Sequence, residues 1–148
     1  MNEVAIRGRA NILALEECMK DLPGYDDGGD EICQITHYHA PGLYGREMWM
    51  PENCLITGKI HKTEHICILS KGKVTVADGG KSVTYHAPAT IISKVGAKRA
   101  IYAHEESVWT NFHATELDDP EEIEQELIAE TFEQLDTYIE HQAQKRIS

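Results

Sequence analysis

Apolar and polar residues alternate in short runs between residues 31 and 115, and a period of two predicts β-strands. Turn-forming residues such as Pro41-Gly42 and Asp78-Gly79-Gly80 separate these runs at strand-sized intervals. The expected strands cover residues 32–39, 43–50, 54–61, 65–70, 73–77, 81–86, 90–94, 97–103 and 107–113. Such a succession of short strands predicts a mainly β fold, a single β-sandwich or β-barrel.

The N-terminal residues follow a different pattern, which predicts one short helix over residues 12–21. Asn11 suits the N-cap position, and Leu22-Pro23-Gly24 would end the helix. We expect residues 1–9 to be frayed, because chain ends are poorly ordered unless contacts tie them down. Residues 25–30 are polar and glycine-rich, and they predict a turn-rich linker.

The C-terminal residues 120–146 predict one long helix, with Asp119 as N-cap and Pro120 at the first helical position. Its apolar stripe repeats at helical spacing and consists of Ile128, Phe132, Leu135 and Ile139. Such a stripe needs an apolar partner, either the outer face of the barrel or a second subunit. Because a helix of this length reaches ~40 Å, more than the width of a small barrel, we favour a homodimer or higher homo-oligomer.

A length of 148 residues suits one domain with a substantial core. We divide the chain into an N-terminal helix and linker (1–30), a β-barrel (31–115) and a C-terminal amphipathic helix (116–148). No apolar run approaches the ~18 residues of a membrane helix, and the first residues lack the apolar stretch of a secretory signal. The four cysteines form no C-x-x-C pair, so free thiols in a reducing cytoplasm are expected.

The net charge of −11 is concentrated at one end. Residues 1–115 carry 12 Lys and Arg against 14 Asp and Glu, whereas residues 116–148 carry 2 against 11. An acidic tail of this kind argues against binding to a nucleic-acid backbone. A small anionic ligand stays compatible with the sequence, because basic groups around one pocket decide its binding.

Two histidines, His61 and His65, lie beside a bend between two expected strands. Residues two apart on a strand share a face. If His61 and His65 lie on either side of the bend and both face inward, their rings meet in one hollow inside the barrel. Two imidazoles with a third donor suit Zn²⁺, Fe²⁺, Mn²⁺ or Ni²⁺. The candidates for the third donor are His113 and Glu47.

Two other histidine patterns carry less weight. His61, Glu64 and His65 match the HxxEH pattern of inverted zincins, but that motif requires a helix and the flanking residues here favour strands. His37 and His39 share one strand face, and we expect a structural or surface role for them.

The stretch from Gly58 to Gly72 resembles the first motif of the cupin superfamily, G-x5-H-x-H-x3,4-E-x6-G. When the motif is aligned on its last glycine, His61 falls at the second His position and His65 at the Glu position. Lys59 stands at the first His position.

The run Val95-Gly96-Ala97-Lys98-Arg99 resembles the second cupin motif, with Arg99 at its His position. The resemblance covers roughly residues 35–113 and implies a cupin-type β-barrel, also called a double-stranded β-helix. The chain is further similar to small cupin-like proteins encoded by tailed phages. The stretches that carry this second likeness are residues 40–47, 61–65, 93–99 and 108–110.

Lys59 and Arg99 would place two cations where metal-binding cupins place imidazoles. Cations beside His61 and His65 oppose a bound metal ion and favour an anion, and the guanidinium fork suits phosphate or carboxylate. The expected ligand-binding residues are Lys59, His61, His65, Arg99 and Arg46, with Tyr102 and Trp109 as an aromatic face for a base.

These residues support three hypotheses. The favoured one is a binding module whose barrel pocket holds an anionic or nucleotide-like ligand; in a phage-encoded protein it would act in the host cytoplasm, where sequestering a defence signal would be a sensible use. The alternative is a metal-dependent cupin enzyme, an isomerase, dioxygenase or lyase, with His61 and His65 as ligands and His113 or Glu47 as the third. The last is an interaction protein that assembles through its C-terminal helix or barrel face.

Overall fold

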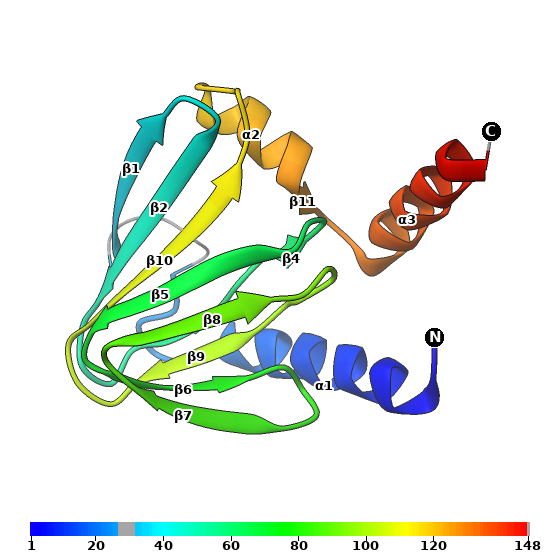
Figure 1. The fold of residues 1–148 in the computed structure, drawn as a ribbon. Helices are drawn as coiled ribbons and strands as arrows, with labels where there is room; N and C mark the ends of the chain where they lie inside the picture. The colour runs from blue at the N-terminus through cyan, green and yellow to red at the C-terminus, as the bar shows by residue number, and fades with distance from the viewer. Residues whose placement is uncertain (27–31, 148) are drawn as a thin grey trace.

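A computed structural model describes residues 1–26 and 32–147 of the chain. Within these residues, two larger antiparallel sheets pack face to face, and three helices lie around one end of the sandwich (Figure 1). The mainly β prediction is confirmed. The expected linker over residues 25–30 and the expected boundary at residue 30 fall largely outside the described residues.

The larger sheet has five strands in the order β1-β2-β10-β5-β8. Their bounds are Gln34–Ala40 (β1), Leu43–Met50 (β2), Ser107–Ala114 (β10), His65–Lys71 (β5) and Ala89–Ser93 (β8). The central strand β10 joins the β1–β2 hairpin to β5, so residues from opposite ends of the chain become neighbours.

The second sheet has four strands in the order β3-β9-β6-β7. Their bounds are Leu55–Thr57 (β3), Ala100–Ala103 (β9), Lys73–Ala77 (β6) and Ser82–His86 (β7). A short two-stranded sheet pairs β4 (Ile60–His61) with β11 (Ile128–Ala129). Most strands begin and end within a few residues of the expected positions, because the alternation of buried and exposed residues defines them. The single strand expected over residues 54–61 is wrong, because the chain forms β3 and β4 there, in different sheets.

The main core lies between the two larger sheets. Alternate residues of β5 are buried while their neighbours are more exposed, which is the signature of a strand with one face toward a core. The buried core residues are Cys33, Met48, Met50, Cys54, Cys67, Leu69, Val74, Val76, Ile101, Ala103 and Trp109.

Helix α1 runs from Glu3 to Met19, so the expectation of a frayed N-terminus is wrong. The Asn2 side chain accepts a hydrogen bond from the Ala5 backbone N–H and caps the helix nine residues before the expected cap, Asn11. Asn11, the expected cap, lies inside the helix and donates to the Gly79 carbonyl at 2.8 Å. There the helix backbone lies so close to the loop that a Cβ on Gly79 would sit 2.1 Å from the Gly8 carbonyl oxygen.

The single helix expected over residues 120–146 is also wrong, because the chain forms two helices there. Helix α2 covers Pro120–Leu127 and α3 covers Phe132–Ile147, with β11 between them. The predicted N-cap is confirmed, since the Asp119 carboxylate accepts from the Glu122 backbone N–H. The helix breaks because Ile128 and Ala129 pair with β4 as an extended strand.

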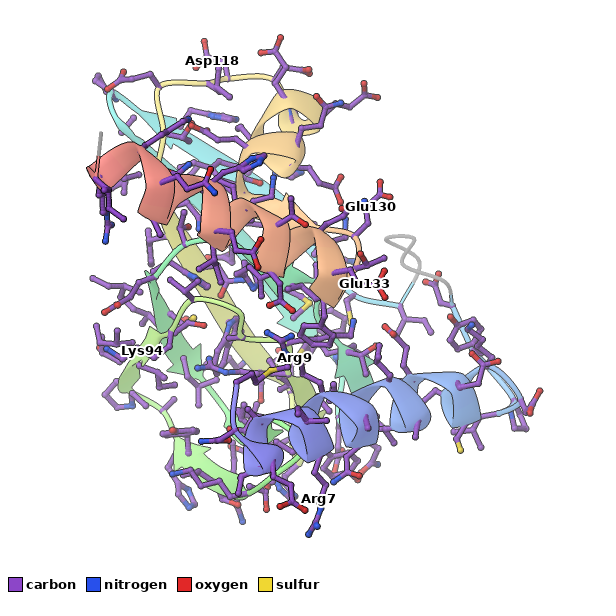
Figure 2. All side chains as sticks on the ribbon, turned by 90° about the vertical axis from the view of Figure 1, so that its right-hand side faces the viewer. Arg7, Arg9, Lys94, Asp118, Glu130 and Glu133 are labelled. Atoms are coloured by element: carbon purple, nitrogen blue, oxygen red, sulfur yellow. The ribbon has the colours of Figure 1, made fainter. Side chains whose placement is uncertain are left out.

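The apolar stripe of the C-terminal segment is divided between two small clusters on the sandwich. Ile128 packs against the cluster of Tyr44, Ile123 and Leu127, while Phe132 and Leu135 pack with Ile60 and Ala129. Helix α3 is tied to α1 by Arg9 and Asp136, which form two hydrogen bonds of 2.9 and 3.0 Å. Figure 2 shows α1 and α3 on the same side of the molecule, with Arg9 between them.

None of the helices in the described ranges combines the length and the apolar content that a membrane crossing requires.

Candidate functional site

A cavity of about 270 Å³ opens between the two large sheets at the end covered by α2. Seven residues expected at the site from sequence line it: Arg46, Lys59, His61, His65, Arg99, Trp109 and His113. Helix α2 contributes Pro120, Ile123, Glu124 and Leu127 to the same wall. The interrupted C-terminal segment therefore helps to enclose the cavity.

The strands explain why three histidines meet there. His65 opens β5 and shares its buried face with Cys67 and Leu69. His113 lies near the end of β10, the strand beside β5, on the inward face with Trp109. His61 ends β4, and its position is held by pairing with Ile128 of β11.

The three imidazoles form a close cluster. The ring centroids of His61 and His65 are 4.4 Å apart, those of His65 and His113 are 4.3 Å apart, and those of His61 and His113 are 5.5 Å apart. One ring nitrogen from each residue lies within 4.8 Å of the others. This is a group of donors that can hold one metal ion.

Backbone carbonyls fix the orientation of two of these rings. His61 Nδ1 lies 3.4 Å from the Ala97 oxygen, and His65 Nδ1 lies 3.2 Å from the Thr63 oxygen. Because a carbonyl oxygen only accepts, each Nδ1 must carry the proton, which leaves the Nε2 lone pair free for a ligand bond. Metal-binding histidines commonly have this arrangement of one backbone bond and one free nitrogen.

The third ring, His113, is buried, and its Nδ1 has no hydrogen-bond partner among the residues that the structure describes. A buried polar atom without a partner is costly to a folded protein, so such an atom calls for an explanation. A ligand in the cavity would supply the missing partner.

The environment keeps the cluster neutral. Burial is the main cause that lowers the pKa of His61 to about 3 and the pKa of His113 to about 4, with neighbouring His65 as the next cause for both. The pKa of His65 is also lowered, chiefly by burial and further by the Arg99 charge. Neutral imidazole is the form that binds metals, so these shifts keep the donors available near pH 7.

Cationic groups stand on the same cavity wall. The Arg99 charge opposes the burial that raises the pKa of the Cys67 thiol, and Arg46 lies opposite Asn111 in the β2–β10 register. Lys59 also lines the cavity, but its ammonium group is ion-paired with Glu124 of α2. The two guanidinium groups are therefore the better candidates for holding an anion.

Tyr102 and Glu47 are not part of this site. Tyr102 donates to Asn53 Oδ1 at 2.8 Å and contacts His104 edge to face, whereas its neighbour Ile101 faces the cavity. Glu47 follows the cavity-lining Arg46 and does not itself line the cavity. Side chains alternate between the two faces of a strand, so a residue next to an inward-facing one points outward. This rule excludes Tyr102, next to Ile101, and Glu47, next to Arg46, from the cavity wall.

The structure adds to the cavity wall residues that were not among the expected ligand-binding residues, above all Tyr44. Its ring lies 6.4 Å from the ring of His113, and its hydroxyl lies 2.6 Å from His37 Nδ1. Tyr44 shares strand parity with Arg46, and this was the available signal. Asn111 also lines the cavity because it shares a strand face with His113, and Cys67 does so because it shares a face with His65.

No protein-family model matches the chain, and no curated protein sequence matches it. Solved structures do match. EutQ from Salmonella typhimurium superposes with a TM-score of 0.52 at 10% identity, over 63% of this chain and 77% of that one. EutQ from Clostridium difficile gives 0.50 at 14% identity, over 61% and 74% of the two chains.

A cupin superfamily protein from Desulfitobacterium hafniense also superposes with a TM-score of 0.50, at 3% identity, over 60% of this chain and 83% of that one. At such low identities the likeness concerns the fold alone. The fold is that of a cupin-type β-sandwich, as the sequence motifs implied. The likeness to phage proteins stays a prediction.

Proposed function

We propose that this chain, with its cupin-type fold, is a metal-dependent enzyme that binds a divalent transition metal ion through His61, His65 and His113 and acts on a small anionic molecule in the same cavity. The observation that carries the proposal is the convergence of three imidazoles, of which His65 and His113 are buried and His61 is half-buried. Two of them have Nδ1 bonded to a carbonyl, and the third, His113, has an Nδ1 without a partner among the described residues.

The donor set fits a transition metal. Imidazole nitrogens suit Zn²⁺, Fe²⁺, Ni²⁺ and Cu²⁺, and catalytic sites often use three protein ligands with a position left open for substrate. A bound ion of this kind would supply Lewis-acid polarisation of a substrate oxygen. The protein's own part is to hold the imidazoles neutral and oriented and to exclude water.

The cavity chemistry supports an anionic substrate. A metal held by three neutral imidazoles keeps its full positive charge, and Arg99 and Arg46 add two more on the wall. A carboxylate or phosphate group would balance that charge and match the guanidinium fork. A volume of about 270 Å³ lies just below the usual range for ligand pockets, which favours a small anion over a whole nucleotide.

A second candidate is a metal-free module that only binds an anion. It is favoured by one observation, the Arg99 charge that helps to lower the pKa of both His61 and His65. The same charge would weaken the binding of a cation. If the chain is phage-encoded, such a module could sequester a host signal molecule.

Metal titration separates the two candidates. The metal-stripped protein is titrated with Zn²⁺, Fe²⁺ (under nitrogen), Mn²⁺ and Ni²⁺ by calorimetry, and metal content is measured after dialysis. We expect one ion per chain, with His113→Ala weakening binding at least about tenfold. The matched control is His141→Ala, which removes an exposed imidazole on α3 and should change nothing.

The opposite results are equally informative. Absence of binding for all four ions would refute the metal-dependent proposal. If anions such as phosphate or succinate then bind in the presence of chelator, and binding is lost in Arg99→Gln, the module without metal is the better description.

A further inference from the structure

Two free thiols, one beside each large sheet, lie next to each other near the cavity. Cys33 precedes β1 of the five-stranded sheet, and Cys54 precedes β3 of the four-stranded sheet. Their sulfur atoms are 3.5 Å apart, and both side chains are buried, with 8% and 9% exposure. A disulfide has an S–S distance of about 2.05 Å, so an approach of roughly 1.5 Å would join them.

Each thiol lines a different cavity. Cys33 belongs to the wall of the cavity that holds the histidine cluster. Cys54 lines a second cavity of about 350 Å³ between the end of α1 and the turn before β3. A small oxidant entering the second cavity would therefore meet Cys54 first, with Cys33 directly behind it.

The electrostatics distinguish the two sulfurs. The hydrogen bond from Cys33 is the main cause that lowers the pKa of Cys54 to about 7. The same contact raises the pKa of Cys33, helped by burial and by the Asp26 charge and opposed by Arg46. Near neutral pH Cys54 is the better nucleophile, because the thiolate and not the thiol reacts.

We propose that Cys33 and Cys54 form a dithiol–disulfide couple that is oxidised by hydrogen peroxide and links the two sheets of the sandwich. In the first step the Cys54 thiolate attacks one peroxide oxygen, the O–O bond breaks, and hydroxide leaves as Cys54 becomes a sulfenic acid. In the second step the Cys33 sulfur displaces the sulfenic oxygen, the S–S bond forms, and water leaves. Two thiols and one peroxide thus give one disulfide and two waters.

The remaining cysteines provide internal controls. Cys67 lines the histidine cavity, is 1% exposed, and has a pKa raised to about 11 by burial. Cys18 is exposed on α1. Among the described residues, Cys18 and Cys67 have no second cysteine sulfur in contact. We therefore expect neither of them to form an intramolecular disulfide.

Oxidation would have a local and a global effect. It draws the Cys33 sulfur toward Cys54 and away from the cavity wall. It also closes a loop around the β1–β2 hairpin, and a cross-link between two sheets restricts the unfolded chain. We therefore expect the melting temperature of the oxidised protein to rise by about 5 °C or more.

The test uses the full chain, reduced and then kept in chelator so that no metal catalyses oxidation. Increasing hydrogen peroxide should lower the count of free thiols from four to two and the intact mass by about 2 Da, with a cross-linked Cys33–Cys54 peptide after digestion. In Cys33→Ser the reaction should stop at a sulfenic acid on Cys54, which dimedone labels. The matched control is Cys18→Ser, which removes an exposed thiol and should still lose two free thiols, from three to one.

Two results would overturn the proposal. One is a wild-type protein that keeps four free thiols at peroxide concentrations that oxidise the same chain in urea. The other is a disulfide that maps to Cys18 or Cys67, or that links two chains. Both readouts come from the wild-type protein, so they stand even if a variant folds poorly.

Discussion

His113 shows how burial turns an ordinary side chain into a candidate ligand. Its position on β10 places it beside two other imidazoles, and its neutral state follows from removal from water. The alternation of side chains along β10 indicates that His113 faces inward. The sequence does not indicate that its Nδ1 has no partner among the described residues, because that depends on how three separate strands meet.

The lowered pKa values predict how the metal-free protein responds to acid. An unfolded histidine has a pKa of about 6.5, whereas folded His61 and His113 have values of about 3 and 4. Between pH 6.5 and 4 the unfolded chain therefore binds more protons, and the free energy of unfolding must fall as pH falls. Each of the two groups contributes on the order of 3 kcal/mol to this loss.

Urea denaturation of metal-free protein from pH 8 to pH 4 measures this dependence. His113→Ala should flatten the curve, and His141→Ala should leave its slope unchanged. A wild-type stability that is constant from pH 6.5 down to pH 4 would show that the three imidazoles are not buried in the neutral form.

The role of Arg99 in anion binding can be tested by a single substitution. Replacing it by Gln removes a positive charge that faces His61, His65 and Cys67. We expect the affinity for succinate or phosphate to fall about tenfold or more, since charge-assisted hydrogen bonds to a guanidinium are strong. Metal affinity should rise, because a repulsive charge is lost.

Calorimetry with each probe measures both effects, and Lys94→Gln is the matched control. Lys94 is also cationic, but its side chain is 75% exposed and paired with Glu64. Equal losses of anion binding in the two variants would mean that net charge, and not the cavity, attracts the anion.

Among the elements, the strands follow directly from the alternation of the sequence, whereas the helix break needs a capping signal. Alternation alone places β2, β6 and β10 within a residue or so, because each buries one face. The helix break at residues 128–131 has its sequence signal in Thr131 and Gln134. Thr131 caps α3 by accepting from the Gln134 backbone N–H, and the Gln134 side chain accepts from the Glu130 backbone N–H.

The broken helix predicts unequal roles for two residues of one apolar stripe. Leu135 is fully buried against Ile60 and Ala129, whereas Ile139 is 41% exposed. Leu135→Ala should lower the free energy of unfolding by about 2–5 kcal/mol, as large-to-small changes in a core do. Ile139→Ala should cost well under about 1 kcal/mol.

Urea denaturation of the two variants compares them directly. Similar losses for both would mean that the stripe is buried as a whole, for example against another subunit. A loss confined to Leu135 supports the packing of α3 on its own chain.

In the whole molecule, the three helices of the described ranges lie around one end of the sandwich (Figure 1), and several apolar side chains on the outer face of the larger sheet are exposed. A row of apolar residues crosses that face in register, through the pairs Tyr38–Gly45, Gly45–Phe112, Phe112–Ile66 and Ile66–Ile92. Tyr38, Ile66 and Ile92 are 53%, 44% and 48% exposed. Because α3 already packs its buried leucine within the chain, the barrel face becomes the better contact for the expected homo-oligomer.

The exposed apolar row predicts which substitution separates the subunits. Ile66→Glu places a charge in the middle of the apolar row and should convert a dimer into a monomer, since an unpaired charge in an apolar interface is strongly disfavoured. Ile139→Glu places the same charge on α3 and should leave the dimer intact. Light scattering after size-exclusion chromatography gives the mass of each variant, and circular dichroism checks that each is folded. If Ile139→Glu is the variant that dissociates, the subunits contact each other through α3. If the wild type is a monomer at roughly 100 µM, the apolar row has some role other than self-association.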